Sequence, residues 1–164
     1  MKKQKGFSLI ELLIVVAIIL IIAAIAIPNL LKSKMAANES SAVGSLRTIN
    51  TGQVTYAASC PAIGFSATLA ELNTGALCAG GAGIIDNVLS SGTKSGYTFT
   101  YTAAQNGTTL NTSYVSNATP QTVGVTGQRM FCSDQSGVLR YTLNGTGCAV
   151  PAVGATTGGS AALQ

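Results

Sequence analysis

The stretch that decides the fold is residues 2–28, KKQKGFSLIELLIVVAIILIIAAIAIP. Within it, residues 12–27 form an unbroken run of sixteen apolar side chains. A helix over residues 7–31, at about 1.5 Å per residue, is longer than a bilayer hydrocarbon core of about 30 Å. These residues therefore predict a single membrane-spanning helix.

Lysines flank this helix on both sides. They are Lys2, Lys3 and Lys5 before it, and Lys32 and Lys34 after it. Because positive residues near a membrane span favour the cytoplasmic side, the larger N-terminal cluster predicts that the N-terminus lies in the cytoplasm. The bulk of the chain would then lie outside.

Two residues are unusual for a membrane span. Glu11 places a carboxylate inside the apolar stretch, where a charge costs a few kcal/mol and is usually kept together with a partner. Pro28 lacks a backbone donor and is expected to kink the helix or loosen a turn.

Residues 32–58 are predicted to continue the helix as an amphipathic segment, because apolar residues recur near the helical period. Two glycines, Gly44 and Gly52, weaken this prediction by about 1 kcal/mol each relative to alanine. The apolar positions are Met35, Ala42, Val43, Leu46, Ile49, Val54 and Ala57. The polar positions between them are Asn38, Glu39, Ser45, Arg47 and Gln53. We predict one helix from about residue 7 to about residue 58, apolar all round at first and one-faced later.

The segment after the helix, residues 59–95, is rich in turn signals, with a short helix near 67–72 or 84–89. Residues 97–102 then alternate strictly, as a half-buried strand does. The aromatic face is Tyr97, Phe99 and Tyr101, and the other face is Thr98, Thr100 and Thr102.

Further strands are predicted within residues 96–150. Asn106-Gly107 indicates a tight turn before a strand near 112–116, and the flanks of residues 134–137 indicate a hairpin. The tail, residues 151–164, is rich in Gly, Ala and Thr and is expected to be loose. The predicted fold is α+β, a long N-terminal helix packed on a small antiparallel sheet of three or four strands.

The composition disfavours catalysis and nucleic-acid binding. The 164-residue chain has no histidine, which removes the commonest general base and most catalytic zinc sites. Without the first six residues, six basic residues (9 − 3) stand against five scattered acidic ones. That balance lacks the clustered charge of a nucleic-acid-binding surface. We predict no catalytic residue, no metal and no cofactor.

Four cysteines, Cys60, Cys78, Cys132 and Cys148, follow the apolar run. An even number in an exported segment favours disulfides, and three pairings are possible. We favour Cys60–Cys78 with Cys132–Cys148, because each closes a local loop of roughly 15–18 residues, worth about 3 kcal/mol in the chain-entropy model. Buried free thiols are the alternative.

The stretch KGFSLIELLIVVAIILIIAAIAIP resembles the class III signal of type IV pilins and related pseudopilins. The resemblance implies that a leader, residues 1–6, is cut off after Gly6, and that Phe7 becomes the new, methylated N-terminus. Glu11 then matches the family's glutamate at the fifth mature position, and Pro28 matches its helix-kinking proline. Both would serve assembly.

Two other interpretations compete for the same residues: a cleaved signal peptide with Ala24-Ile25-Ala26 as its cut site, and a plain membrane anchor. Neither gives Glu11 a partner. The ammonium of a freed Phe7, in the same or a neighbouring copy, would supply one. An opposite pair at about 4 Å is worth about 4 kcal/mol at an effective dielectric near 20.

The resemblance implies a structural subunit, the major pilin of a type IV pilus. Its implied partners are prepilin peptidase, the assembly platform with its ATPase, the inner membrane before assembly, and copies of itself in a helical homopolymer. Heterologous contacts between identical subunits produce such open filaments. The mature protein would be extracellular, where pili serve adhesion, motility, DNA uptake or secretion.

Two alternative functions stay open. The first is a pseudopilin of a type II secretion system, a class that typically binds calcium near its C-terminus through several oxygen ligands. Asp134 is the only acid after Asp86, and Cys132 with Cys148 resembles the disulfide-bounded end of pilins, so we favour the pilus. The second is an anchored or secreted disulfide-bonded binding domain that does not polymerise.

Overall fold

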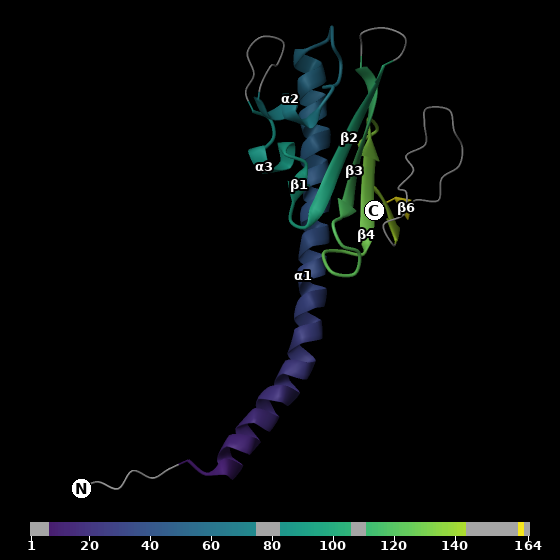
Figure 1. The fold of residues 1–164 in the computed structure, drawn as a ribbon. Coiled ribbons are helices and arrows are strands. Elements are labelled where there is room, and N and C mark those ends of the chain that lie inside the picture. Colours follow the sequence, from purple (N-terminus) through teal and green to yellow (C-terminus); the bar gives the residue numbers. More distant parts are fainter. Residues whose placement is uncertain (1–6, 75–82, 106–110, 144–160, 163–164) are drawn as a thin grey trace, which may run out of the picture. The chain divides into compact units, whose positions relative to one another are not determined.

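The computed structural model describes residues 7–74, 83–105, 111–143 and 161–162. The chain divides into two units, Met1–Lys34 and Met35–Gln164, which are described separately below. One long helix, α1 (Leu9–Ser59), contributes to both (Figure 1). This confirms the prediction of a single helix from about residue 7 to about residue 58.

In the first unit, none of the described residues of α1 is buried. The large apolar side chains from Phe7 to Leu31 are 46–85% exposed. Among the described residues, α1 is the helix that is long and apolar enough to cross a membrane, and no residue of its most apolar window is buried. An apolar surface of this extent requires a nonaqueous environment or a partner.

In the second unit, α1 buries one face. Ala42, Leu46 and Ile49 lie in the core, as the spacing predicts. The prediction that Val54 lies on that face is wrong, because its side chain is 64% exposed. Gly52 is buried beside Ile84, close enough that a methyl group there would lie 3.1 Å from the Ile84 side chain.

Three side chains expected on the polar face are instead buried, and they are Glu39, Ser45 and Gln53. Gln53 donates to the Ser66 hydroxyl (2.7 Å), and its side-chain oxygen accepts from the Ser66 N–H (3.0 Å). Buried polar groups persist where their hydrogen bonds are made, so these contacts explain why the polar residue replaces Val54 in the core.

Two short helices follow α1, close to both places where a short helix was expected. They are α2 (Leu69–Thr74) and α3 (Asn87–Ser90). Asp86 caps α3, since its carboxylate accepts from the Leu89 N–H at 2.6 Å. Lys94 pairs with the same carboxylate at 2.6 Å.

The sheet is antiparallel throughout and has the strand order β1-β2-β3-β4-β5-β6. Its strands are β1 (Thr93–Lys94), β2 (Tyr97–Gln105), β3 (Asn111–Pro120), β4 (Arg129–Asp134), β5 (Arg140–Leu143) and β6 (Ala161–Ala162). The four longer strands are those expected from the sequence. The two-residue strands β1 and β6 lengthen the sheet at its edges.

One face of the sheet packs on the second half of α1 (Figure 1). In the register, Phe99 lies opposite Ala118, and Ala118 lies opposite Phe131. All three belong to the same core cluster as Leu46 and Ile49. The alternation predicted for β2 is confirmed, because Tyr97 and Phe99 are buried while Thr100 is exposed.

The predicted hairpin is also confirmed, since β4 and β5 pair directly. Its turn includes Gly137 at φ +73°, a left-handed conformation that glycine adopts readily. The predicted turn at Asn106-Gly107 lies outside the described residues.

Candidate functional site

The start of α1 places Glu11 against the helix end. Ser8 immediately precedes the helix, and its backbone N–H donates to Glu11 Oε2 at 3.0 Å. In a capping box, a glutamate three residues after Ser accepts from that residue's N–H in this way. Glu11 therefore has a hydrogen-bond partner within its own chain, which Ser8-x-x-Glu11 signals but which we did not predict.

This position also suits the carboxylate electrostatically. The first turn of a helix carries unsatisfied N–H groups and a partial positive charge that favours an anion. The N–H bonded to Glu11 belongs to the residue directly after Phe7. A positive charge formed at the nitrogen of Phe7 would therefore lie within about one helical turn of the carboxylate.

The expected cleavage position cannot be described fully, because Gly6 lies outside the described residues. Phe7 is described, precedes the helix and is 85% exposed. The roles of Gly6 and Phe7 in cleavage, and of Phe7 in methylation, stay predictions.

Pro28 lies inside α1. Because proline has no N–H, the carbonyl of Ala24 loses its usual donor four residues on. Side chains add polar contacts nearby: Asn29 Nδ2 donates to the Ile25 carbonyl (3.1 Å), and Ser33 Oγ donates to the Asn29 carbonyl (3.0 Å). The kink expected at Pro28 stays a prediction.

A second polar site joins α1 to β4 within the second unit. Glu39 accepts from the backbone N–H groups of Gln128 (2.9 Å) and Arg129 (3.1 Å). It also accepts from Arg129 Nε at 2.7 Å and Nη2 at 2.6 Å. Burial raises the pKa of Glu39, but these donors and the guanidinium charge outweigh it and hold the pKa below the ordinary value.

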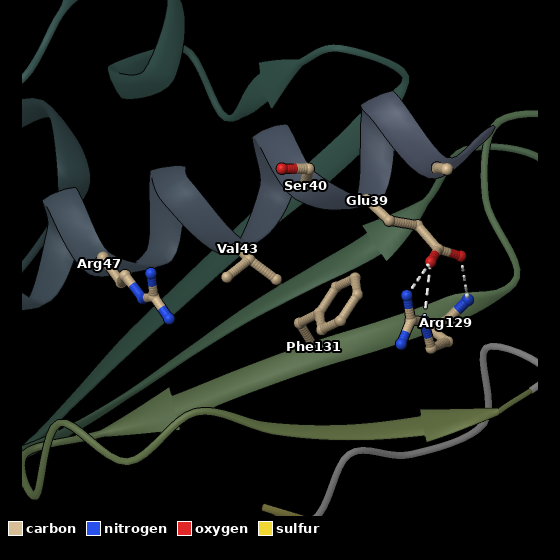
Figure 2. A pocket seen from close by; sticks show the side chains of 7 residues that line it. Glu39, Ser40, Val43, Arg47, Arg129 and Phe131 are labelled. Atoms are coloured by element: carbon tan, nitrogen blue, oxygen red, sulfur yellow. Dashed lines mark hydrogen bonds and ion pairs between the residues drawn. The ribbon is translucent and has the colours of Figure 1, made fainter. Parts of the chain in front are cut away.

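A pocket of about 240 Å³ lies beside this ion pair. It is lined by Ala36, Glu39, Ser40, Val43, Arg47, Arg129 and Phe131. Figure 2 shows Arg47 toward one side, the Glu39–Arg129 pair toward the other, and Val43 and Phe131 between them. The Arg129 guanidinium also lies 5.6 Å from the ring centre of Phe131 and of Tyr141, within cation–π range.

Two of the four cysteines can be described. Cys60 and Cys132 are buried, and each is disulfide-bonded rather than free. Their expected partners, Cys78 and Cys148, lie outside the described residues. The pairing Cys60–Cys78 and Cys132–Cys148 therefore stays a prediction.

Comparison with known proteins identifies the class to which the N-terminal region belongs. Residues 1–27 match the prokaryotic N-terminal methylation motif. The long helix and the antiparallel sheet that follow this motif form a pilin-like α+β fold. No solved structure matches the chain.

Two curated relatives are type IV pilins. The chain is 48% identical over 54 residues to the type IV major pilin protein PilA of Myxococcus xanthus, covering 33% of this chain and 24% of that protein. It is 60% identical over 40 residues to the type IV wide pilus major component PilA4 of Thermus thermophilus, covering 24% and 30% respectively. The similarity to type IV major pilins is thus limited to 40–54 residues, and the matches span about a quarter to a third of these relatives' length.

Proposed function

We propose that this chain is the major structural subunit of a type IV pilus and polymerises through its N-terminal helix into an extracellular filament. The observation that carries the proposal is the first half of α1. It exposes apolar side chains on all sides, lies within the methylation motif and begins with a carboxylate at its N-terminal turn. Both relatives are named as major pilus components, which favours a pilus over a secretion pseudopilus.

Before assembly, the apolar half of α1 spans the inner membrane, with the basic leader on the cytoplasmic side. The leader peptidase cuts between Gly6 and Phe7, next to an exposed residue that is not helical. The cut converts the peptide nitrogen of Phe7 into an amine, which is then methylated. At neutral pH that amine is cationic and can pair with Glu11 of the same or a neighbouring subunit.

After extraction from the bilayer by the assembly platform and its ATPase, the apolar surface needs another cover. Copies of the same helix supply it, and small residues within the run let the helices approach closely. These residues are Ala17, Ala23, Ala24 and Ala26. The protein's role on this proposal is structural rather than enzymatic.

N-terminal analysis of sheared surface filaments by mass spectrometry tests the proposal. We expect filaments composed of this chain, beginning at Phe7 with one added methyl group. A mature chain that begins at Ile27, or an intact Met1, would contradict it and favour a secreted or anchored domain. A Glu11→Ala variant should insert into the membrane as the wild type does but yield few filaments, whereas normal filaments would refute the role of Glu11.

A further inference from the structure

The side-chain charges of the second unit are almost fully paired. All five acidic residues of the chain lie among the described residues. Three of them form ion pairs within this unit: Glu39–Arg129 (2.6 Å), Asp86–Lys94 (2.6 Å) and Asp134–Arg140 (3.4 Å). Among the described residues of this unit, the acid and the base left without an ion pair are Glu71 and Arg47.

Arg47 borders the pocket between α1 and β4 (Figure 2). The other guanidinium there, that of Arg129, is already neutralised by Glu39. The lining therefore carries one uncompensated positive charge, next to the apolar side chains of Val43 and Phe131. A guanidinium binds a carboxylate through two parallel N–H bonds, so this pocket suits an acidic side chain with an aliphatic stem.

Glu71 presents a carboxylate in a fixed position on α2. Its Oε2 accepts from the Ala67 N–H at 2.7 Å, and its own N–H donates to Thr68 Oγ1 at 3.4 Å. The exposed residues beside it are small and uncharged, and they are Ala67, Thr68 and Ala70. Another protein surface can therefore approach this carboxylate closely.

We propose that the Arg47 pocket of one copy receives Glu71 of a neighbouring copy of this chain. The two patches are different surfaces of the same unit, so the contact is heterologous and repeats from copy to copy without being self-complementary. Complementary charges of this kind fix the register of an interface and exclude wrong arrangements. The inference rests on the proposed filament and assigns the second unit a specific contact in it.

Charge reversal in the full-length chain, expressed in a strain that lacks its own copy, tests the contact. Arg47→Glu and Glu71→Arg should each reduce sheared filaments by at least about tenfold, equivalent to about 1.4 kcal/mol, because each places like charges together. The double variant should restore most of the yield. Thr55→Glu adds an acid on the exposed side of α1, outside the pocket, and should leave the yield unchanged.

Two further variants separate the contact from folding. Glu71→Gln keeps an acceptor for the Ala67 N–H but removes the charge, so it should lower the yield while the precursor accumulates normally. With cysteines at both positions, Arg47→Cys and Glu71→Cys, oxidised filaments should run as a ladder of cross-linked subunits.

Failure of the inference is distinguishable from failure of the proposed function. If the wild type forms filaments but single reversals have no effect, or the double variant is no better than the singles, the Arg47–Glu71 contact is wrong. If the wild-type chain is absent from surface filaments, the pilus assignment itself fails. Rescue by the double variant together with cross-linking supports both.

Discussion

The two halves of α1 show two opposite relations between hydrophobicity and burial. In the first unit the helix consists almost wholly of apolar residues and buries almost none of them. In the second unit it contains more polar residues and buries Glu39, Ser45 and Gln53 with the apolar core. Apolar content alone therefore does not locate a core. A helix can also expose an apolar surface that a bilayer or other subunits can cover.

The largest expected difference between the halves is in the free energy of unfolding when a leucine is replaced by alanine. Leu46 is fully buried, so Leu46→Ala should destabilise the second unit by about 2–5 kcal/mol. Leu20 is 63% exposed, and Leu20→Ala should change the unfolding of that unit by no more than about 0.5 kcal/mol. Thermal unfolding of the full chain in detergent, followed by circular dichroism, measures both. Equal losses of stability in the two variants would contradict the difference in burial between the two halves of α1.

An added charge should harm the first half of α1 more than the second, which is the reverse of the leucine substitutions. Ile19 and Val54 are similarly exposed, at 57% and 64%. Ile19→Asp places a carboxylate near the middle of the span, at a cost of about 2.5–3.5 kcal/mol, so the precursor should accumulate poorly in membranes. Val54→Asp should accumulate normally. Membrane fractionation with immunoblotting compares them, and poor accumulation of the second variant would show that Val54 has a partner.

What the sequence allowed us to predict follows the same division. Continuous apolar content predicted the first half of α1, and strict alternation predicted β2, because both signals are local. The burial of Glu39 and Gln53 was not predictable from helical spacing. Glu39 depends on Gln128 and Arg129, about ninety residues away, and Gln53 depends on the loop at Ser66.

The candidate site shows the same limit. The sequence singles out Phe7, Glu11 and Pro28 because they belong to one short motif. The hydrogen bond of Ser8 could have been predicted from the same motif. The pocket that contains Arg47 could not, since α1 and β4 form it together. Periodicity gives the side of a helix on which a residue lies, but it does not give the partner that covers that side.

Lowering the pH should reduce the stability that Glu39 provides in the second half of α1. Since the pKa of Glu39 is lowered in the folded protein, its contribution to stability is present above the ordinary value near 4.5 and is lost as the pH falls through the lower, folded value. Glu39→Gln should therefore be less stable than the wild type at neutral pH, by roughly 1–3 kcal/mol, and the gap should narrow below about pH 4.5.

Denaturant melts of both proteins at several pH values measure this gap. Because the two proteins share their other acids, Asp86 included, the difference between them isolates Glu39. A gap that stays constant down to pH 3 would contradict the role given to its ion pair and backbone hydrogen bonds.

The smallest expected effect on stability concerns the hydrogen bond at the start of the first half. Glu11→Gln keeps an oxygen acceptor for the Ser8 N–H, so helix formation in the uncut precursor should be nearly unchanged. Glu11→Ala removes the acceptor, at a cost of about 0.5 kcal/mol of local stability. Amide hydrogen exchange at residues 8–12 in detergent separates the two variants. Both variants should assemble poorly, because both remove the negative charge. Normal assembly of Glu11→Gln would show that assembly needs only a hydrogen-bond acceptor at this position.

The hydrogen bond between Ser8 and Glu11 has a consequence for timing. Because the Ser8 N–H already donates to the Glu11 carboxylate, we expect a precursor to remain in the membrane before Phe7 supplies a charged partner. On the proposed function, the cell can then hold a standing reserve of unprocessed subunits.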